Sequence, residues 1–231
     1  MESFGIRVHA PMQHLREYFE ILRKSFTGKP VSFSGQFYKV SNWDFEVEPI
    51  RKNIPLYLGA MGPNAIRLAG EISDGLFFGT MCPLKHIKYG LKTARMSCKN
   101  AGKDTEGFYS GAVILTSVSK TSQETKKNVK LGLATYSTVV HYKHILEAAD
   151  FARERAKIAD AIEANQLADA TSHVTDEMIN AFTISGTMEE CRCKLEEYRT
   201  VGLKLPLIYP YLADYPHLKE HYITVIRAFT D

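Results

Sequence analysis

The sequence predicts an α/β fold in which parallel strands alternate with helices. Apolar stretches at residues 54–60 and 75–80 each end in a short turn containing Gly-Pro or Cys-Pro and lead into a helical pattern. Similar apolar stretches lie at 111–118 and 205–209. A closed barrel of this type needs eight strands and typically about 250 residues. Four strands therefore predict an arrangement like half of such a barrel, with right-handed crossovers between the strands.

The residues ahead of the first of these strands predict a helix and a small hairpin. Apolar side chains recur at helical spacing over 11–26, and Gly28 ends the pattern. Residues 31–33 and 37–40, separated by Ser-Gly-Gln, predict the hairpin. Residues 43–53 are predicted as a linker. No strand is predicted before the first helix, which is unusual for an α/β chain.

The stretch at 54–63 predicts a strand, a tight turn and the start of a helix. Its first six residues are mostly apolar and do not alternate, which is typical of a strand buried on both faces. Gly59 and Gly62 would let the backbone turn tightly and approach a ligand closely, and Pro63 suits the first helical position. Amides at such a helix start favour a phosphate group. An ordinary strand-to-helix turn is the alternative, and Gly-x-x-Gly-Pro by itself favours it.

The later part of the chain is mostly helical between its strands. Two helix starts have the spacing of a capping box, from Thr121 to Glu124 and from Thr187 to Glu190. The near absence of Gly and Pro over 123–170 indicates two or three helices there. The other helices are predicted at 63–73, 83–100, 175–182, 187–202 and 216–229.

Composition and charge exclude several classes of function. Of the 231 residues, 24% are charged and 45% hydrophobic, which is ordinary for a globular protein. The net charge of +3 and the lack of a dense basic run argue against a nucleic-acid partner. No apolar run approaches the roughly 18 residues that cross a membrane, and no signal-peptide pattern is present. The four cysteines form no Cys-x-x-Cys pair, so we expect a cytoplasmic protein with reduced thiols.

Two groups of polar residues require a choice between a functional and a structural interpretation. His217, Glu220 and His221 match the H-x-x-E-H pattern of some zinc proteases. Nothing in the sequence nominates a third protein ligand, so we interpret these histidines as surface residues and predict no metal site. Asp74 could be a functional carboxylate, but its place before Gly75 and a strand is typical of a turn. The sequence thus assigns no catalytic residue.

Four stretches of the chain resemble one enzyme family. Residues 54–63 and 68–75 are similar to the luciferase-like monooxygenase superfamily, and 28–35 and 174–187 support the likeness. Within this superfamily the stretches are most similar to coenzyme F420-dependent oxidoreductases such as methylenetetrahydromethanopterin reductase. The resemblance covers nearly the whole chain in the order of the family. It implies hydride transfer with coenzyme F420, and an FMN-dependent monooxygenase is the alternative.

The resemblance also implies where the site and the domain boundaries lie. Members of the family are (β/α)8 barrels, and Met1 aligns just after their fourth strand. We therefore expect 1–231 to be a single luciferase-like domain that lacks the first four strands and their acid and base groups. The resemblance implies that the turn after the first strand lies against the cofactor, with Thr80 after the next strand as a weaker candidate. The predicted cofactor-binding residues are Gly59, Ala60, Met61, Gly62, Pro63 and Thr80.

The expected partners follow from the same resemblance. The family acts on small-molecule substrates. Half a barrel exposes an unpaired strand edge at 54–60 and the apolar residues of a barrel interior, and such surfaces pair with other chains. We therefore expect either a homo-oligomer or a complementing N-terminal half. A truncated gene product without activity of its own is the non-enzymatic alternative.

Overall fold

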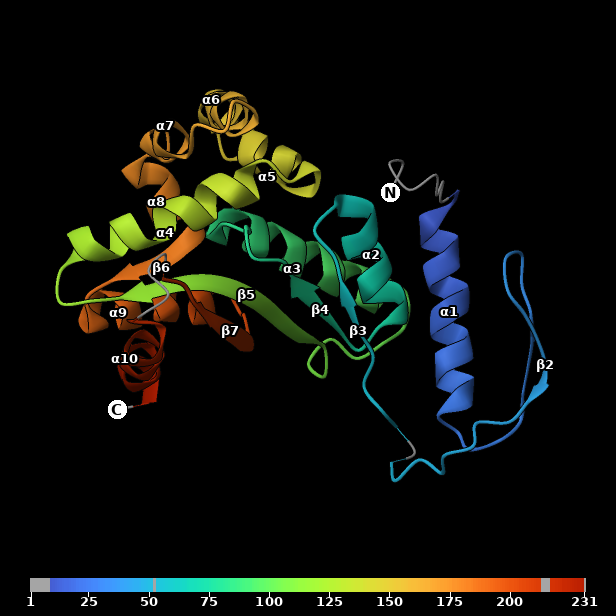
Figure 1. Cartoon of the computed structure of the whole chain (residues 1–231). Helices are drawn as coiled ribbons and strands as arrows, with labels where there is room; N and C mark the ends of the chain where they lie inside the picture. Colours follow the sequence, from blue (N-terminus) through green and yellow to red (C-terminus); the bar gives the residue numbers. More distant parts are fainter. Residues whose placement is uncertain (1–8, 52, 213–216, 231) are drawn as a thin grey trace. The chain divides into compact units, whose positions relative to one another are not determined.

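The computed structural model describes residues 9–51, 53–212 and 217–230, and the chain has an α/β fold in which strands alternate with helices (Figure 1). It divides into two compact units. The first unit contains residues 1–76 and 93–109, and the second contains 77–92 and 110–231. The chain passes from one unit to the other within two strands and one helix, so each unit is described in turn.

The described helices and strands carry the labels of Figure 1. The helices are α1 Pro11–Ser25, α2 Pro63–Ile72, α3 Leu84–Asn100, α4 Ser122–Ser137, η2 Val140–Tyr142, α5 Lys143–Ala148, α6 Ala152–Glu163, α7 Leu167–Ser172, α8 Asp176–Phe182, α9 Met188–Thr200 and α10 Leu218–Thr230. The strands are β1 Val31–Ser34, β2 Lys39–Trp43, β3 Tyr57–Gly59, β4 Gly75–Phe78, β5 Tyr109–Val118, β6 Thr183–Gly186 and β7 Leu205–Pro210. No helix among the described residues is long and apolar enough to cross a membrane.

The first unit begins with α1 and the predicted hairpin, which is confirmed as β1 and β2 in antiparallel pairing. The buried carboxylate of Glu17 on α1 accepts hydrogen bonds from the amides of Gln36, Phe37 and Tyr38 at 2.9–3.0 Å. Burial raises the pKa of Glu17, but these bonds and one from the Gln13 side chain outweigh it and lower the pKa to about 2. One carboxylate therefore holds the turn of the hairpin against α1.

A glycine in the hairpin turn makes this contact possible. A Cβ atom on Gly35 would lie 2.4 Å from Glu17 Oε2, closer than any non-bonded contact allows. The hairpin also extends further than the sequence indicated, because β2 continues to Trp43 into the stretch predicted as a linker. The rings of Trp43 and Phe45 meet edge to face with centroids 5.6 Å apart.

Strand β3 is shorter and more exposed than predicted. It spans Tyr57–Gly59 instead of 54–60, and only Leu58 of its three residues is buried. The prediction that both faces of this strand are buried is therefore wrong. Tyr57 is an aromatic residue on the exposed side of an alternating strand, and an apolar run cannot distinguish this case from full burial.

The C-terminal end of α2 is held by a lysine from a different segment. Lys103 Nζ donates hydrogen bonds to the carbonyls of Gly70, at 3.2 Å, and Ser73. A cation near the last carbonyls of a helix stabilises the negative end of its dipole. Desolvation lowers the pKa of Lys103, so its burial carries a cost that these carbonyls offset in part.

The second unit is built around β5, which is ten residues long and almost entirely buried. Its residues 111–116 pair in parallel with 205–210 of β7, and residues 115–118 pair in parallel with 183–186 of β6. Helices α4 and α9 both pack on β6, and Figure 1 shows them on opposite sides of that strand. The predicted α/β fold with parallel strands is confirmed.

Strand β6 was not predicted, so the described residues contain five strands besides the hairpin instead of about four. Its sequence Thr183-Ile-Ser-Gly186 is only four residues long, follows α8 without a turn and contains one large apolar residue. Such a segment carries no periodicity of its own. Its pairing with β5 makes it a strand.

The helical predictions hold better than the strand predictions. The stretch 123–170 is helical as predicted, but it forms α4, η2, α5, α6 and most of α7, so the predicted number of two or three helices is wrong. At α9, Thr187 and Glu190 form the reciprocal capping box that their spacing predicts. At α4, Thr121 accepts from the Glu124 amide, while the Glu124 carboxylate accepts from Ser119. The predicted start of the last helix at Pro216 lies outside the described residues.

Candidate functional site

The turn between β3 and α2 belongs to the first unit and contains five of the six predicted cofactor-binding residues. Gly59 ends β3, Gly62 is the N-cap of α2, and Pro63 occupies the first helical turn as predicted. Both glycines are exposed, whereas Ala60 is buried and Met61 is half-buried. The structure therefore presents the two glycines and Pro63 to the outside of the unit, while Ala60 points inward.

Of the two predicted reasons for glycine, a tight turn and close approach to a ligand, the first does not hold at position 62. Gly62 has φ −80° and ψ 152°, a conformation that any residue adopts. The tight turn thus does not require glycine at position 62. A Cβ atom added to Gly59 or Gly62 would meet no atom within 4 Å, so packing within the protein does not require glycine either. What the two glycines provide is open space directly above the backbone.

The N-terminus of α2 adds a favourable electrostatic environment to this space. Gly62 offers no side chain that could cap the helix, and the first turn contains no acidic residue. The positive end of the helix dipole is therefore not neutralised by a carboxylate of its own first turn. Open backbone at a helix start of this kind fits a phosphate group, which both F420 and FMN carry.

Thr80, the sixth predicted residue, lies in the second unit, after the end of β4. It is half-buried and makes side-chain and backbone hydrogen bonds with Tyr142. Burial raises the pKa of Tyr142, which these bonds offset only in part. Thr80 thus already has a partner within the protein. The structure places it and the glycine turn in separate units.

Two cavities lie in the second unit. One, of about 550 Å³, runs along the exposed face of α4 and is lined by Gln123, Lys126, Lys127, Lys130 and Asp176. The other, of about 710 Å³, opens at the carboxyl ends of β5, β6 and β7. Neither is lined by the turn at 59–63. That the turn lies against a cofactor therefore stays a prediction.

The histidine pair on α10 corrects one interpretation of the sequence. His217 is exposed, but His221 is buried, so it is wrong to describe both as surface residues. His221 lies on the buried stripe of α10 with Val225 and Ala228, at spacings of four and seven residues. That periodicity is present in the sequence and could have identified it. The described residues contain no group of three or more side chains suited to a metal ion.

Other polar candidates have structural roles. The Asp74 carboxylate accepts hydrogen bonds from the Leu56 amide and from Arg23, which agrees with its interpretation as a turn residue. Cys191 is buried and Cys193 is exposed, because residues two apart on a helix face different directions. Burial raises the pKa of Cys191 and of Cys82 to about 12, so both stay thiols at neutral pH and neither is a nucleophile.

Comparison with known proteins agrees with the fold. A profile of the luciferase-like monooxygenase family matches residues 1–205. The chain is 28% identical over 207 residues to 5,10-methylenetetrahydromethanopterin reductase of Archaeoglobus fulgidus, covering 87% of this chain and 61% of that protein. The chain thus spans about three fifths of the length of this curated relative.

Solved structures give the same result. The coenzyme F420-dependent tetrahydromethanopterin reductase of Methanopyrus kandleri superposes with a TM-score of 0.82 at 25% identity, over 95% of this chain and 64% of that chain. A riboflavin lyase with modified FMN superposes with a TM-score of 0.62 at 13% identity, over 98% of this chain and 60% of that chain, which shows likeness of fold alone. With a family profile that matches most of its residues, the chain belongs to the luciferase-like monooxygenase family.

Proposed function

We propose that the chain is an oxidoreductase that takes part in hydride transfer with coenzyme F420. The observation that carries this proposal is the open backbone of Gly59 and Gly62 at the start of α2, where a Cβ on either residue would meet no atom within 4 Å. The relatives named above support F420 over other cofactors, because both are methanopterin reductases and one is described as F420-dependent.

In this proposal the residues of the turn bind and orient the cofactor. The cofactor would supply the hydride chemistry when bound. The backbone from Gly59 to Pro63 would hold its phosphate, and the dipole of α2 would favour the negative charge. The acid and base groups are not assigned to any residue of this chain, so the proposal concerns binding and not a catalytic step.

FMN and monooxygenase chemistry form the second candidate function. The phosphate of FMN would fit the same turn, and the likeness of fold to a riboflavin lyase with modified FMN favours keeping this candidate. Titration of the purified chain with each cofactor, followed by its fluorescence, separates the two. We expect saturable binding of F420, roughly tenfold tighter than that of FMN. Tighter binding of FMN would reverse the order of the candidates.

We further propose that the chain works with a partner, either a second copy or a polypeptide that carries the N-terminal strands of the barrel. Strand β7 supports this, because the large side chains Leu205, Leu207 and Tyr209 are 37%, 47% and 37% exposed on one of its faces. If neither cofactor binds the isolated chain, the N-terminal part of the Archaeoglobus relative should be added in trans. Binding only in that mixture would identify the isolated chain as inactive by itself. A small-molecule substrate and a cytoplasmic location complete the proposal.

A further inference from the structure

The cavity of about 550 Å³ in the second unit is a groove along α4 that carries a positive charge. Its described lining consists of Gln123, Lys126, Lys127 and Lys130 of α4 and of Asp176, the first residue of α8. Helices α4 and α8 pack against each other, and both belong to the second unit (Figure 1). The groove therefore lies within one compact unit, and three ammonium groups in its lining stand against one carboxylate.

The four lining residues of α4 share one face of that helix. They follow one another at positions i, i+3, i+4 and i+7, a spacing that brings side chains together along one side of a helix. Thr125, Val129 and Leu133, each four residues from the next, form the buried stripe. Helix α4 thus turns its lysines outward as one group. A rise of about 1.5 Å per residue separates the first two lysines from the third by about 4.5–6 Å along the axis.

Two of the three lysines form no ion pair with any described residue. Lys126 Nζ pairs with the Asp176 carboxylate at 2.6 Å. Lys127 is exposed and Lys130 is half-buried, and neither has a carboxylate partner in the part of the chain that the structure describes. Like charges three or four residues apart on a helix repel each other, so this arrangement costs stability. An anion seated among the lysines would relieve that repulsion.

The lining also indicates which kind of anion would fit. The described lining contains no aromatic ring, so it offers no surface on which a nucleobase or another flat ring would stack. A lysine ammonium group is a compact charge with three donors, which suits several separate oxygens around it. Asp176 repels any anion, so a single negative charge gains little in this groove. A molecule with several negative charges gains from all three lysines.

We propose that this groove binds a compact anion that has no ring and carries three or more negative charges. Oxygens of the anion accept hydrogen bonds from the ammonium groups of Lys127 and Lys130, and Lys126 adds its charge from the same face. A short polyphosphate and an aliphatic polycarboxylate share this chemistry. The inference does not depend on F420 or on the turn at 59–63, which belongs to the first unit.

Three probes test the proposal on the full chain at low ionic strength: inorganic tripolyphosphate, citrate and acetate. Calorimetry measures their affinity, and the backbone amide resonances of α4 report where they bind. We expect tripolyphosphate or citrate to bind saturably, roughly tenfold or more tightly than acetate, and to shift the amides of 123–130. The tighter of the two identifies phosphate or carboxylate as the preferred group. No saturable binding of either, or shifts only outside α4, would overturn the proposal.

Three variants separate the groove from the charge of the whole chain. Lys130→Gln removes an ammonium group without an ion-pair partner among the described residues, and should weaken binding of the tighter probe roughly fivefold or more. Asp176→Asn removes the carboxylate of the described lining and should strengthen binding. Lys143→Gln changes the net charge as much as Lys130→Gln, but Lys143 pairs with Glu147 on α5 and should leave the affinity unchanged. An equal loss in both lysine variants would contradict the assigned site.

Discussion

Asp74 and Leu56 are joined by two hydrogen bonds of 2.7 Å each. The Asp74 amide donates to the Leu56 carbonyl, and the Leu56 amide donates to the Asp74 carboxylate. Arg23 of α1 donates to both oxygens of the same carboxylate, at 3.0 and 3.1 Å. Asp74 therefore ties together the chain that enters β3, the chain that enters β4 and helix α1.

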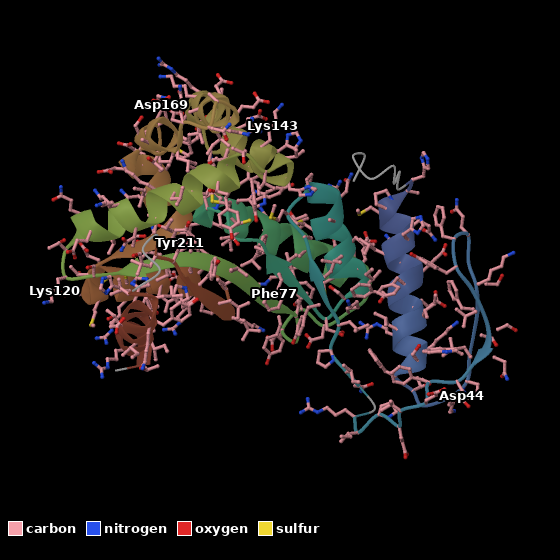
Figure 2. The ribbon with its side chains drawn as sticks, in the orientation of Figure 1. Asp44, Phe77, Lys120, Lys143, Asp169 and Tyr211 are labelled. Atoms are coloured by element: carbon pink, nitrogen blue, oxygen red, sulfur yellow. The ribbon has the colours of Figure 1, made fainter. Side chains whose placement is uncertain are left out.

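Replacing Asp74 with Ala should destabilise the first unit. The change removes the acceptor of the Leu56 amide and the partner of Arg23, so we expect the free energy of unfolding to fall by about 1–3 kcal/mol. Urea unfolding followed by circular dichroism measures this. Asp44→Ala removes an exposed carboxylate, which Figure 2 labels, and should change stability by less than about 0.5 kcal/mol. An equal loss in both variants would contradict the assigned role of Asp74.

The hairpin should separate from α1 at low pH because of Glu17. Its pKa in the folded protein, about 2, is below the ordinary value of 4.5, so the ionised form stabilises the fold. This stabilisation is complete above pH 4.5 and is lost as the pH falls from 4.5 towards 2. Fluorescence of Trp43, the single tryptophan of the chain and part of the hairpin, reports the change.

The matched variants for this prediction are Glu17→Gln and Glu20→Gln. The first should remove the difference in stability between pH 6 and pH 3 that we attribute to Glu17. Glu20 also lies on α1 but is exposed and pairs with Lys24, so its variant should keep the wild-type pH dependence. If Glu17→Gln unfolds with the same pH profile as the wild type, the carboxylate does not control the hairpin.

Replacing Gly62 with Val should weaken binding of the cofactor more than folding. The added side chain enters open space, so its cost to stability is limited to the poorer N-cap, about 1 kcal/mol. A phosphate close to the backbone would collide with the branched side chain. We expect the affinity for F420 to fall by roughly tenfold or more in a fluorescence titration.

Thr121→Val is the control for Gly62→Val. Thr121 is the N-cap of α4 and accepts a hydrogen bond from the Glu124 amide. Its replacement costs about 0.5–2 kcal/mol of stability but leaves the turn at 59–63 intact. Affinity for F420 should therefore stay at the wild-type value. A similar loss of affinity in both variants would mean that lower stability, and not the collision, weakens binding.

Self-association of the purified chain should depend on the exposed face of β7. Leu207→Asp places a charge in the middle of that face and should shift the sedimentation profile towards the monomer. Val140→Asp alters a residue that is 75% exposed in η2, and it should leave the profile unchanged. A compact wild-type monomer at all concentrations would refute the docking role of β7.

The face of β7 is a better docking surface than its edge. Pro206 and Pro210 lie within this strand, and proline cannot donate a ladder hydrogen bond. Among the described residues β5 is its pairing partner. The exposed edge predicted at 54–60 is also short, since β3 contains only three residues. Association through side chains is therefore favoured over the addition of a strand.

The sequence determined the features that depend on neighbouring residues. Helical periodicity and the capping box from Thr187 to Glu190 describe contacts within one turn of helix, and α1, α2 and α9 lie where these patterns place them. Pro63 starts α2 for the same local reason. The candidate turn is likewise encoded locally, because the likeness to a known family is carried by the consecutive residues 54–63.

The tertiary structure decided the features that depend on residues far apart in the chain. Glu17 binds amides 19 to 21 residues away, β6 is a strand because it pairs with β5, and His221 is held by carbonyls of Thr116 and Tyr211. No local pattern encodes these distant partners, although the helical periodicity of α10 does indicate that His221 is buried. The open space above the glycines of the turn could not be predicted from the sequence either, because it depends on how closely the rest of the protein approaches them.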